Sequence, residues 1–205
     1  MFVLGKSLAA ATPNERVVGV LLPNAAANLV TLFGLMAHGR VAAMLNFSTG
    51  GVNMVAACRA AQVRTIVTSR RFIEQAAMET DLAMLEKEAR IVWLEDVRSA
   101  IGGGAKIAGL LKSYAPRLAL WGTRKTRDPK GPAVVLFTSG SEGVPKGVVL
   151  SHRNLNANRH QTAARIAFAD KDVVLNALPM FHAFGLTVGT LLPVLSGVRT
   201  FLYPS

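Results

Sequence analysis

The sequence predicts an α/β fold whose mostly parallel sheets are flanked by helices. Short apolar runs alternate with longer helical segments, an order typical of parallel strands joined by crossover helices. Hydrophobic residues make up 51% of the 205 residues and charged residues 17%, so disorder is excluded as the main state. The single cysteine, Cys58, excludes an internal disulfide framework and a multi-cysteine metal site.

The first half of the chain is predicted to contain four strands with helices between them. Val17–Leu22 is a buried strand that Pro23 ends. Asn24 is the predicted N-cap of an Ala-rich helix that runs to about His38, where Gly39 ends it. The elements that follow are a strand over Val41–Leu45, a helix over Gly51–Ala61, a strand over Arg64–Thr68, a helix over Phe72–Glu88 and a strand over Ile91–Leu94.

The second half is predicted to start with a connecting region over residues 99–130 that contains one helix near Ala105–Tyr114. The later elements are strands over Ala133–Phe137 and Val148–Leu150, a helix from about Asn154 to Ala167, and strands over Asp172–Ala177 and Val198–Tyr203 with a helical stretch between them. Because composition shifts in the connecting region, we divide the chain into a first α/β subdomain (1–115), a connecting loop (116–132) and a second subdomain (133–205) that is incomplete at its C-terminus.

The chain carries a formal net charge of +11 and has an isoelectric point near 10.7. Such a charge favours acidic partners, which include nucleic acid, nucleotide phosphates and anionic lipid. The one tight basic group lacks the interleaved aromatic residues and the motifs of nucleic-acid-binding proteins, so we interpret it as a solvated loop and predict no nucleic-acid partner. This group consists of Arg124, Lys125, Arg127 and Lys130.

Two runs without Asp, Glu, Lys or Arg, residues 17–39 and 173–198, are long enough to span a bilayer. Each contains proline and asparagine, which are costly at mid-membrane depth, so buried strands and helices of an α/β core are the preferred interpretation. The N-terminal Met1–Ala11 lacks the apolar core of a signal peptide. The cytoplasm is therefore the expected compartment.

The segment over residues 138–147 has the composition of a phosphate-binding loop. Its glycines allow the backbone N–H groups to approach an anion, its hydroxyls add donors, and Lys146 adds a positive charge. Composition alone leaves a glycine-rich surface turn as an equal alternative. The loop is not a Walker A motif, because Pro145 replaces the second glycine and a strand follows. The candidate phosphate-binding residues are Thr138, Ser139, Gly140, Ser141, Glu142, Gly143, Lys146 and Gly147.

The order and spacing of this loop resemble the signature loop of the adenylate-forming (acyl-CoA synthetase and luciferase) superfamily. Glu142 replaces the usual Ser or Thr, which resembles the branch of acyl-[acyl-carrier-protein] synthetases and 2-acylglycerophosphoethanolamine acyltransferases. The resemblance extends along nearly the whole chain from about Val17. It rests on Leu21–Asn24, Phe33–Leu35, Met44–Asn46, Asn176–Thr187 and Phe201–Ser205.

The resemblance implies that the chain is part of the large N-terminal domain of an adenylate-forming enzyme. It implies that Thr138, Ser139, Ser141 and Lys146 steady the β- and γ-phosphates of ATP. Glu142 would repel phosphates, but its oxygens suit Mg²⁺. By resemblance His182 and Phe181 line the acyl-substrate pocket; the equal alternative for His182 is a histidine in the core. His152, at a predicted helix start, is interpreted as a capping or surface residue.

The implied reaction joins a fatty acid to ATP as acyl-AMP and passes the acyl group to acyl carrier protein or to CoA. In the bifunctional branch a lysophospholipid then receives it, which implies association with the inner face of the membrane. The family's later motifs for adenine, ribose and adenylation are absent from this chain. We therefore expect an N-terminal piece of a ligase, without a complete catalytic set and inactive in isolation. The alternative is a non-catalytic nucleotide-binding or interaction module derived from the same fold.

Overall fold

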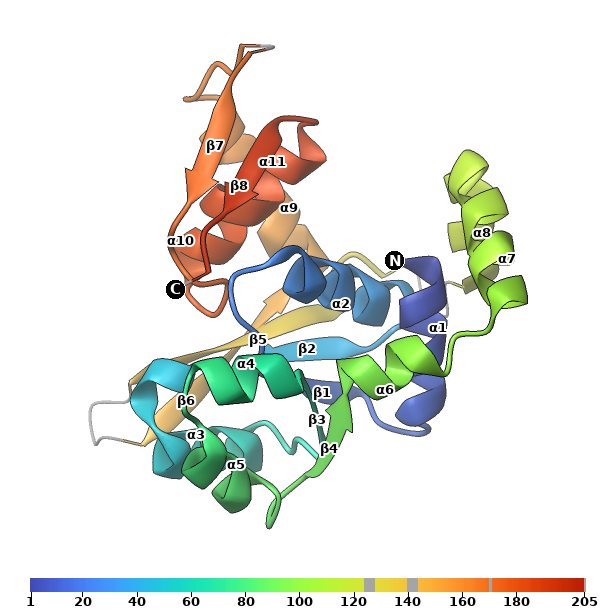
Figure 1. Cartoon of the computed structure of the whole chain (residues 1–205). Coiled ribbons are helices and arrows are strands. Elements are labelled where there is room, and N and C mark those ends of the chain that lie inside the picture. The colour runs from blue at the N-terminus through green and yellow to red at the C-terminus, as the bar shows by residue number, and fades with distance from the viewer. Residues whose placement is uncertain (124–127, 140–143, 170, 205) are drawn as a thin grey trace.

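The computed structural model describes residues 1–123, 128–139, 144–169 and 171–204. Its main element is a six-stranded sheet with the order β4-β3-β1-β2-β5-β6 (Figure 1). The strands are β1 Val17–Val20, β2 Val41–Met44, β3 Thr65–Thr68, β4 Arg90–Trp93, β5 Pro132–Ser139 and β6 Pro145–Ser151. All neighbouring strands pair in parallel except β5 and β6, which form an antiparallel hairpin. The predicted α/β fold with a mostly parallel sheet is confirmed.

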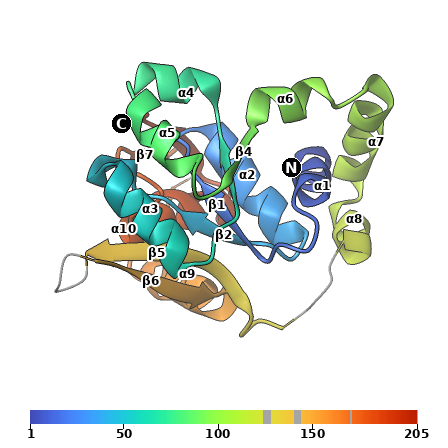
Figure 2. The ribbon, with the colours of Figure 1, turned by 90° about the horizontal axis from the view of Figure 1, so that it is seen from below.

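Helices cover both faces of this sheet because the strand side chains alternate between two cores. On β2, Ala42 and Met44 belong to one buried cluster, whereas Val41 and Ala43 belong to the other. The first cluster includes side chains of α1 (Phe2–Ala11), α2 (Ala26–Ala37) and α9 (His152–Ala163). The second includes side chains of α3 (Gly51–Ala60), α4 (Arg70–Gln75) and α5 (Glu79–Leu85), and these three helices lie together in both ribbon views (Figures 1 and 2).

A second, two-stranded parallel sheet is formed by β7 (Val173–Asn176) and β8 (Arg199–Leu202). A continuous helical stretch joins the two strands, as predicted. It consists of α10 (Ala183–Leu186), the π-helix η2 (Thr187–Leu191) and α11 (Leu192–Leu195). Leu186 and Leu191 from this stretch are buried in the first cluster, together with the side chains of α2 and of the sheet face that α2 covers. The helical layer therefore connects the two sheets.

The predicted division of the chain at 116–132 stays a prediction. The strands before it, β1–β4, and the strands after it, β5 and β6, belong to one sheet. The segment over residues 94–123, which includes the first part of the predicted connecting loop, is more helical than predicted. It contains α6 (Leu94–Ser99), α7 (Gly103–Tyr114) and α8 (Pro116–Thr123). Pro116 is the first residue of α8. A proline is tolerated there because the N–H group that it lacks would have no partner within the helix.

The single helix predicted over Phe72–Glu88 is wrong. Two helices, α4 and α5, occupy this segment, and Ala77 between them has a left-handed φ of +49°. Met78 follows this turn and is only 5% exposed. Its N–H donates to the Ile73 carbonyl over 3.0 Å. The break therefore buries an apolar side chain, which a continuous helical pattern does not foresee.

The predicted N-cap at Asn24 is also wrong. The α2 helix begins at Ala26 with Ala25 at the cap position, and no side chain caps it. Asn24 is 1% exposed, and its side chain donates to backbone carbonyls of the second sheet's strand ends instead. The α9 helix begins two residues before its expected start. There Ser151 is the N-cap and forms a capping box with Asn154, while His152 is the first helical residue.

The two uncharged runs are divided between short strands and helices. Residues 17–39 contain β1 and α2, and residues 173–198 contain β7 and the α10–α11 stretch. Among the described residues, no helix has both the length and the apolar character needed to cross a membrane.

Candidate functional site

The β5–β6 hairpin positions the described part of the predicted phosphate loop. Thr138 and Ser139 end β5, while Lys146 and Gly147 lie near the start of β6. Thr138 pairs directly with Lys146, so their side chains lie on the same face of the hairpin. All four residues are exposed. Four further predicted members of the loop lie outside the described residues: Gly140, Ser141, Glu142 and Gly143.

A cavity of about 370 Å³ lies beside this end of the hairpin. We call it the hairpin cavity. Among the described residues, its polar groups are hydroxyls, amides and one imidazole, and none of the described lining residues is a carboxylate. An anion in it would therefore meet hydrogen-bond donors from these described residues. The lining residues are Asn46, Thr49, Asn53, Met54, Ala57, Phe137, Thr138, Ser139, Pro145 and His182.

Three polar residues of the hairpin cavity were not predicted from the sequence: Asn46, Thr49 and Asn53. Asn46 lies two residues after the end of β2, and its Oδ1 accepts a hydrogen bond from the Ser48 N–H over 3.0 Å, which starts the 3₁₀ helix η1 (Phe47–Thr49). Asn53 donates from Nδ2 to the Thr49 carbonyl over 2.9 Å. The available signal was topological, because β2 and β5 are parallel neighbours and polar residues after such strands meet at one sheet edge.

His182 and Phe181 take different positions, although they are adjacent. His182 is exposed and lines the hairpin cavity, which brings it to the same cavity as Thr138 and Ser139. Phe181 is 5% exposed and does not line that cavity. Its ring contacts Phe47 edge-on at 4.8 Å between centroids and lies 4.6 Å from the His182 ring. Phe181 therefore anchors His182 to the core, and an acyl-binding role for either residue stays a prediction.

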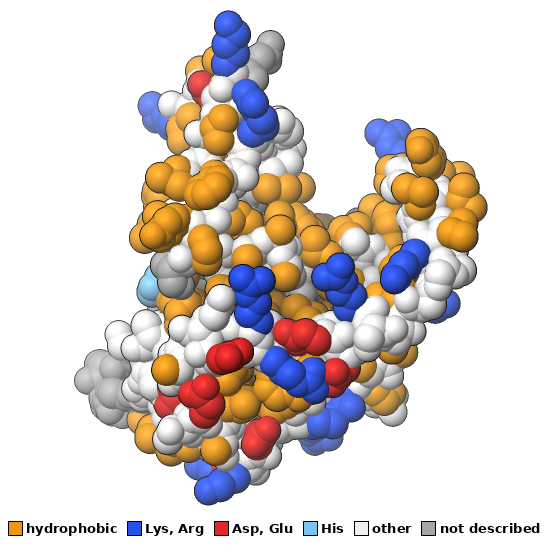
Figure 3. Space-filling model, viewed as in Figure 1, with side chains coloured by type: hydrophobic (Ala, Val, Ile, Leu, Met, Phe, Trp, Pro, Cys, Tyr) orange, Lys and Arg blue, Asp and Glu red, His pale blue; other side chains and the backbone are white. Residues whose placement is uncertain are grey.

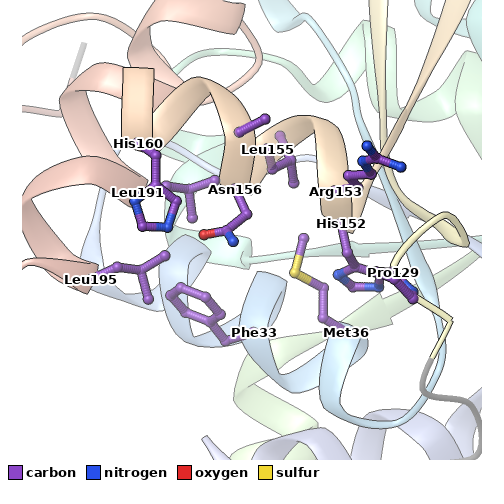
Figure 4. Close-up of a pocket in the computed structure, with 11 residues that line it drawn as sticks. Phe33, Met36, Pro129, His152, Arg153, Leu155, Asn156, His160, Leu191 and Leu195 are labelled. Atoms are coloured by element: carbon purple, nitrogen blue, oxygen red, sulfur yellow. The ribbon is translucent and has the colours of Figure 1, made fainter. Parts of the chain in front are cut away.

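A second cavity, of about 460 Å³, contains none of the predicted site residues. It lies between α2, α9 and the end of the α10–α11 stretch (Figure 4). Phe33 and Met36 of α2 form an apolar wall opposite His152 and Asn156 of α9. The remaining lining residues are Pro129, Arg153, Leu155, Ala157, His160, Leu191 and Leu195.

The described residues contain no group of three or more His, Cys, Asp or Glu side chains that could hold a metal ion. The predicted Mg²⁺ contact at Glu142 lies outside the described residues. Cys58 is 1% exposed, and burial followed by the nearby Glu88 carboxylate raises the pKa of its thiol to about 12. Cys58 is therefore a packed core residue and carries no thiolate at neutral pH.

Curated relatives match the chain over its whole length or over a shorter segment. Sulfoacetate–CoA ligase of Cupriavidus necator is 31% identical over 208 residues, which cover 95% of this chain and 36% of that protein. The medium-chain fatty-acid–CoA ligase of Escherichia coli is 44% identical over 70 residues, or 34% of this chain and 12% of that enzyme. The chain therefore spans about a third or less of the length of these relatives.

Solved structures show the same fold. O-succinylbenzoate coenzyme A synthetase from Bacillus subtilis in complex with AMP superimposes with a TM-score of 0.76 at 18% identity, covering 99% of this chain and 47% of that one. The same enzyme with ATP and magnesium ion gives a TM-score of 0.74. The match therefore confirms the expected N-terminal-domain fold. The family model described as AMP-binding enzyme matches residues 4–205, and the chain belongs to this family of AMP-binding enzymes.

Proposed function

We propose that this chain is the phosphate-binding part of an ATP-dependent ligase that activates a fatty acid as acyl-AMP and passes the acyl group to a thiol. The observation that carries the proposal is the hairpin cavity, which Thr138 and Ser139 line together with His182. Family membership and the relatives named as CoA ligases support it. The donor set fits a polyphosphate, since the described lining offers hydroxyls and amides as hydrogen-bond donors.

In this reaction a carboxylate oxygen attacks the α-phosphorus of ATP. A new P–O bond forms, and the bond to the pyrophosphate group breaks, so negative charge grows on the leaving group. Thr138 and Ser139 would donate hydroxyl hydrogen bonds to it, and the Lys146 ammonium, opposite Thr138 in the hairpin, would offset its charge. His182, at the same cavity, would face the carboxylate of the acid.

Mg²⁺ would neutralise the phosphates during the reaction. The described lining of the hairpin cavity offers only hydroxyl and amide oxygens, which fits an ion that keeps its water and phosphate ligands. We assign Glu142, which lies outside the described residues, as a candidate ligand of this ion on the resemblance alone.

The fatty acid is the favoured substrate over a short polar acid such as sulfoacetate. Met54, Ala57 and Phe137 give the hairpin cavity an apolar side, which suits an alkyl chain. The acceptor is CoA or acyl carrier protein. The names of the relatives favour CoA, whereas the Glu142 departure favours acyl carrier protein and transfer onward to a lysophospholipid.

The experiment is a titration of the 205-residue chain with a non-hydrolysable ATP analogue and Mg²⁺ by calorimetry. Loss of a hydrogen bond to a charged group costs about 1.5–3 kcal/mol, so Lys146→Ala should weaken binding by about 10–100-fold. Lys171→Ala, which removes an exposed lysine far along the chain, is the matched control. Equal affinities for the two variants would contradict the proposal.

Substrate class is tested by ligand-observed NMR with octanoate and with sulfoacetate, each added to the complex with the ATP analogue. We expect saturation transfer to the octanoate methylenes and a loss of this signal in His182→Ala. Binding of sulfoacetate alone would show that the substrate class is wrong while leaving the ATP site intact.

A further inference from the structure

The α7 and α8 helices form an arm, residues 103–123, that projects from the body of the molecule (Figure 1). A stripe of large apolar side chains runs along it, each between 61 and 82% exposed. The four on α7 lie three or four positions from one another along the helix and share one helical face, and the two on α8 are three positions apart and share a face of that helix. The stripe consists of Ile107, Leu110, Leu111, Tyr114, Leu118 and Trp121.

The opposite face of α7 holds the arm against the body. A Cβ on Gly109 would lie 2.2 Å from Cγ2 of Val3 in α1, so the two helices are in close contact there. At 3.6 residues per turn, Gly109 lies about 200° around the helix from Ile107. The α7 part of the apolar stripe therefore faces away from the contact that fastens the arm.

Charge on and around the arm is of one sign. No Asp or Glu occurs between residues 97 and 127. Lys106 and Lys112 lie on either side of the stripe of α7, and Arg117 lies on α8. Figure 3 shows hydrophobic and basic side chains on the arm and no acidic ones in that view, whereas acidic side chains gather on the body below it.

We propose that the arm lies along the surface of an anionic lipid bilayer. A helix with an apolar face, flanking lysines and aromatic residues is suited to the boundary between headgroups and acyl chains. The stripe would enter the acyl boundary, and Lys106, Lys112 and Arg117 would reach the lipid phosphates. Nucleic acid would use the cations but leave the leucines exposed, and an exposed apolar patch of this size is uncommon on a surface without a partner. The arm shares no residue with the hairpin cavity.

The experiment is co-sedimentation of the 205-residue chain with vesicles of phosphatidylglycerol and phosphatidylcholine in equal parts, compared with phosphatidylcholine alone. We expect binding to the anionic vesicles only. A basic residue near the surface contributes about fivefold in affinity, so Lys106→Gln with Lys112→Gln should weaken binding about 25-fold. The control pair, Arg165→Gln with Lys171→Gln, removes two exposed charges outside the arm and should leave affinity within about twofold.

The apolar half of the proposal has its own readout. In a Trp93→Phe background, Trp121 is the remaining tryptophan, and its emission should shift to shorter wavelength on anionic vesicles. Leu110→Ser with Leu111→Ser should remove both the shift and the binding while the circular dichroism spectrum is kept, because both leucines are exposed. No binding, equal effects of the two charge pairs, or tighter binding to RNA without a Trp121 shift would overturn the proposal. None of these results depends on ATP binding.

Discussion

Asn24 donates a hydrogen bond from Nδ2 to the backbone carbonyl of Asn176 over 2.7 Å, although 152 positions separate the two residues. The same amide reaches the Tyr203 carbonyl at 3.1 Å. Asn176 ends β7 and Tyr203 follows β8, so one side chain from the large sheet's side of the molecule fixes both strands of the small sheet. The Tyr203 N–H also donates to the Asn176 carbonyl, over 3.0 Å.

Asn24→Ala should destabilise the protein by about 1–3 kcal/mol, because it removes both hydrogen bonds from the Asn24 amide to the strand ends of the small sheet and leaves the Asn176 carbonyl with the Tyr203 N–H alone. Asn158→Ala, at an exposed position on α9, should change the free energy of unfolding by less than about 0.5 kcal/mol. Urea unfolding of both variants measures the difference. Equal stability of the two would show that the Asn24 bond contributes nothing to the docking of the small sheet.

Gly189→Ala should destabilise the π-helical segment. A Cβ there would lie 2.2 Å from Oδ1 of Asn176. The Asn176 amide also donates to the Gly185 carbonyl over 3.1 Å and to Thr190 Oγ1 over 2.9 Å. The clash would displace this buried network, at a cost of about 2 kcal/mol or more.

The matched substitution for this test is Gly104→Ala, inside α7, where a Cβ would meet nothing within 4 Å. It should stabilise the protein by about 0.5–1 kcal/mol through helix propensity. Thermal unfolding of the two variants should therefore shift in opposite directions. A shift of the Gly189 variant in the same direction would contradict the packing argument.

Phe47→Ala should disturb the hairpin cavity, because Phe47 belongs to a row of aromatic rings, Phe72, Phe47 and Phe181, that ends at His182. The Phe47 ring contacts Phe72 at 5.1 Å and Phe181 at 4.8 Å, both edge-on. Each such contact contributes about 0.5–1.5 kcal/mol beyond burial. We expect a stability loss of about 2–4 kcal/mol together with a shifted His182 imidazole proton resonance, since Phe181 carries the contact on to His182.

Phe201→Ala is the comparison for that variant, because its ring is 57% exposed on β8. It should leave the His182 resonance in place. An unchanged resonance in Phe47→Ala as well would show that the aromatic row does not position His182.

The stability of the protein should fall at alkaline pH through Cys58. Its pKa is raised from 9.0 to about 12, chiefly by burial. A raised pKa favours the neutral thiol in the folded state, so its contribution is complete below pH 9 and is lost between about pH 9 and pH 12. At about 1.4 kcal/mol per pH unit, the stability difference between wild type and Cys58→Ala should shift by about 2 kcal/mol from pH 8 to pH 10.5. Urea unfolding at the two pH values checks this, and a constant difference would contradict it.

The sequence by itself located the strands of the large sheet to within one or two residues, except that β6 begins three residues before its predicted run. Runs such as Val17–Leu22 are continuous and apolar because both faces of a parallel sheet are covered. The two strands that flank the glycine loop were also predicted, since glycines and hydroxyls separate two apolar runs, but their antiparallel pairing was not. The same local pattern is what relates the chain to its family.

Only the tertiary structure decided where the long-range partners lie. In the folded protein the Asn24 side chain joins the two sheets and does not cap α2. A buried amide must form hydrogen bonds, and the carbonyls at the strand ends of the small sheet accept them. The tertiary structure broke the Phe72–Glu88 helix at Ala77 so that Met78 could enter the core. It also brought Asn46, Thr138 and His182, far apart in the chain, to one cavity. Local sequence sets helix and strand tendencies, whereas these contacts depend on how covered sheet faces stack, which no short segment contains.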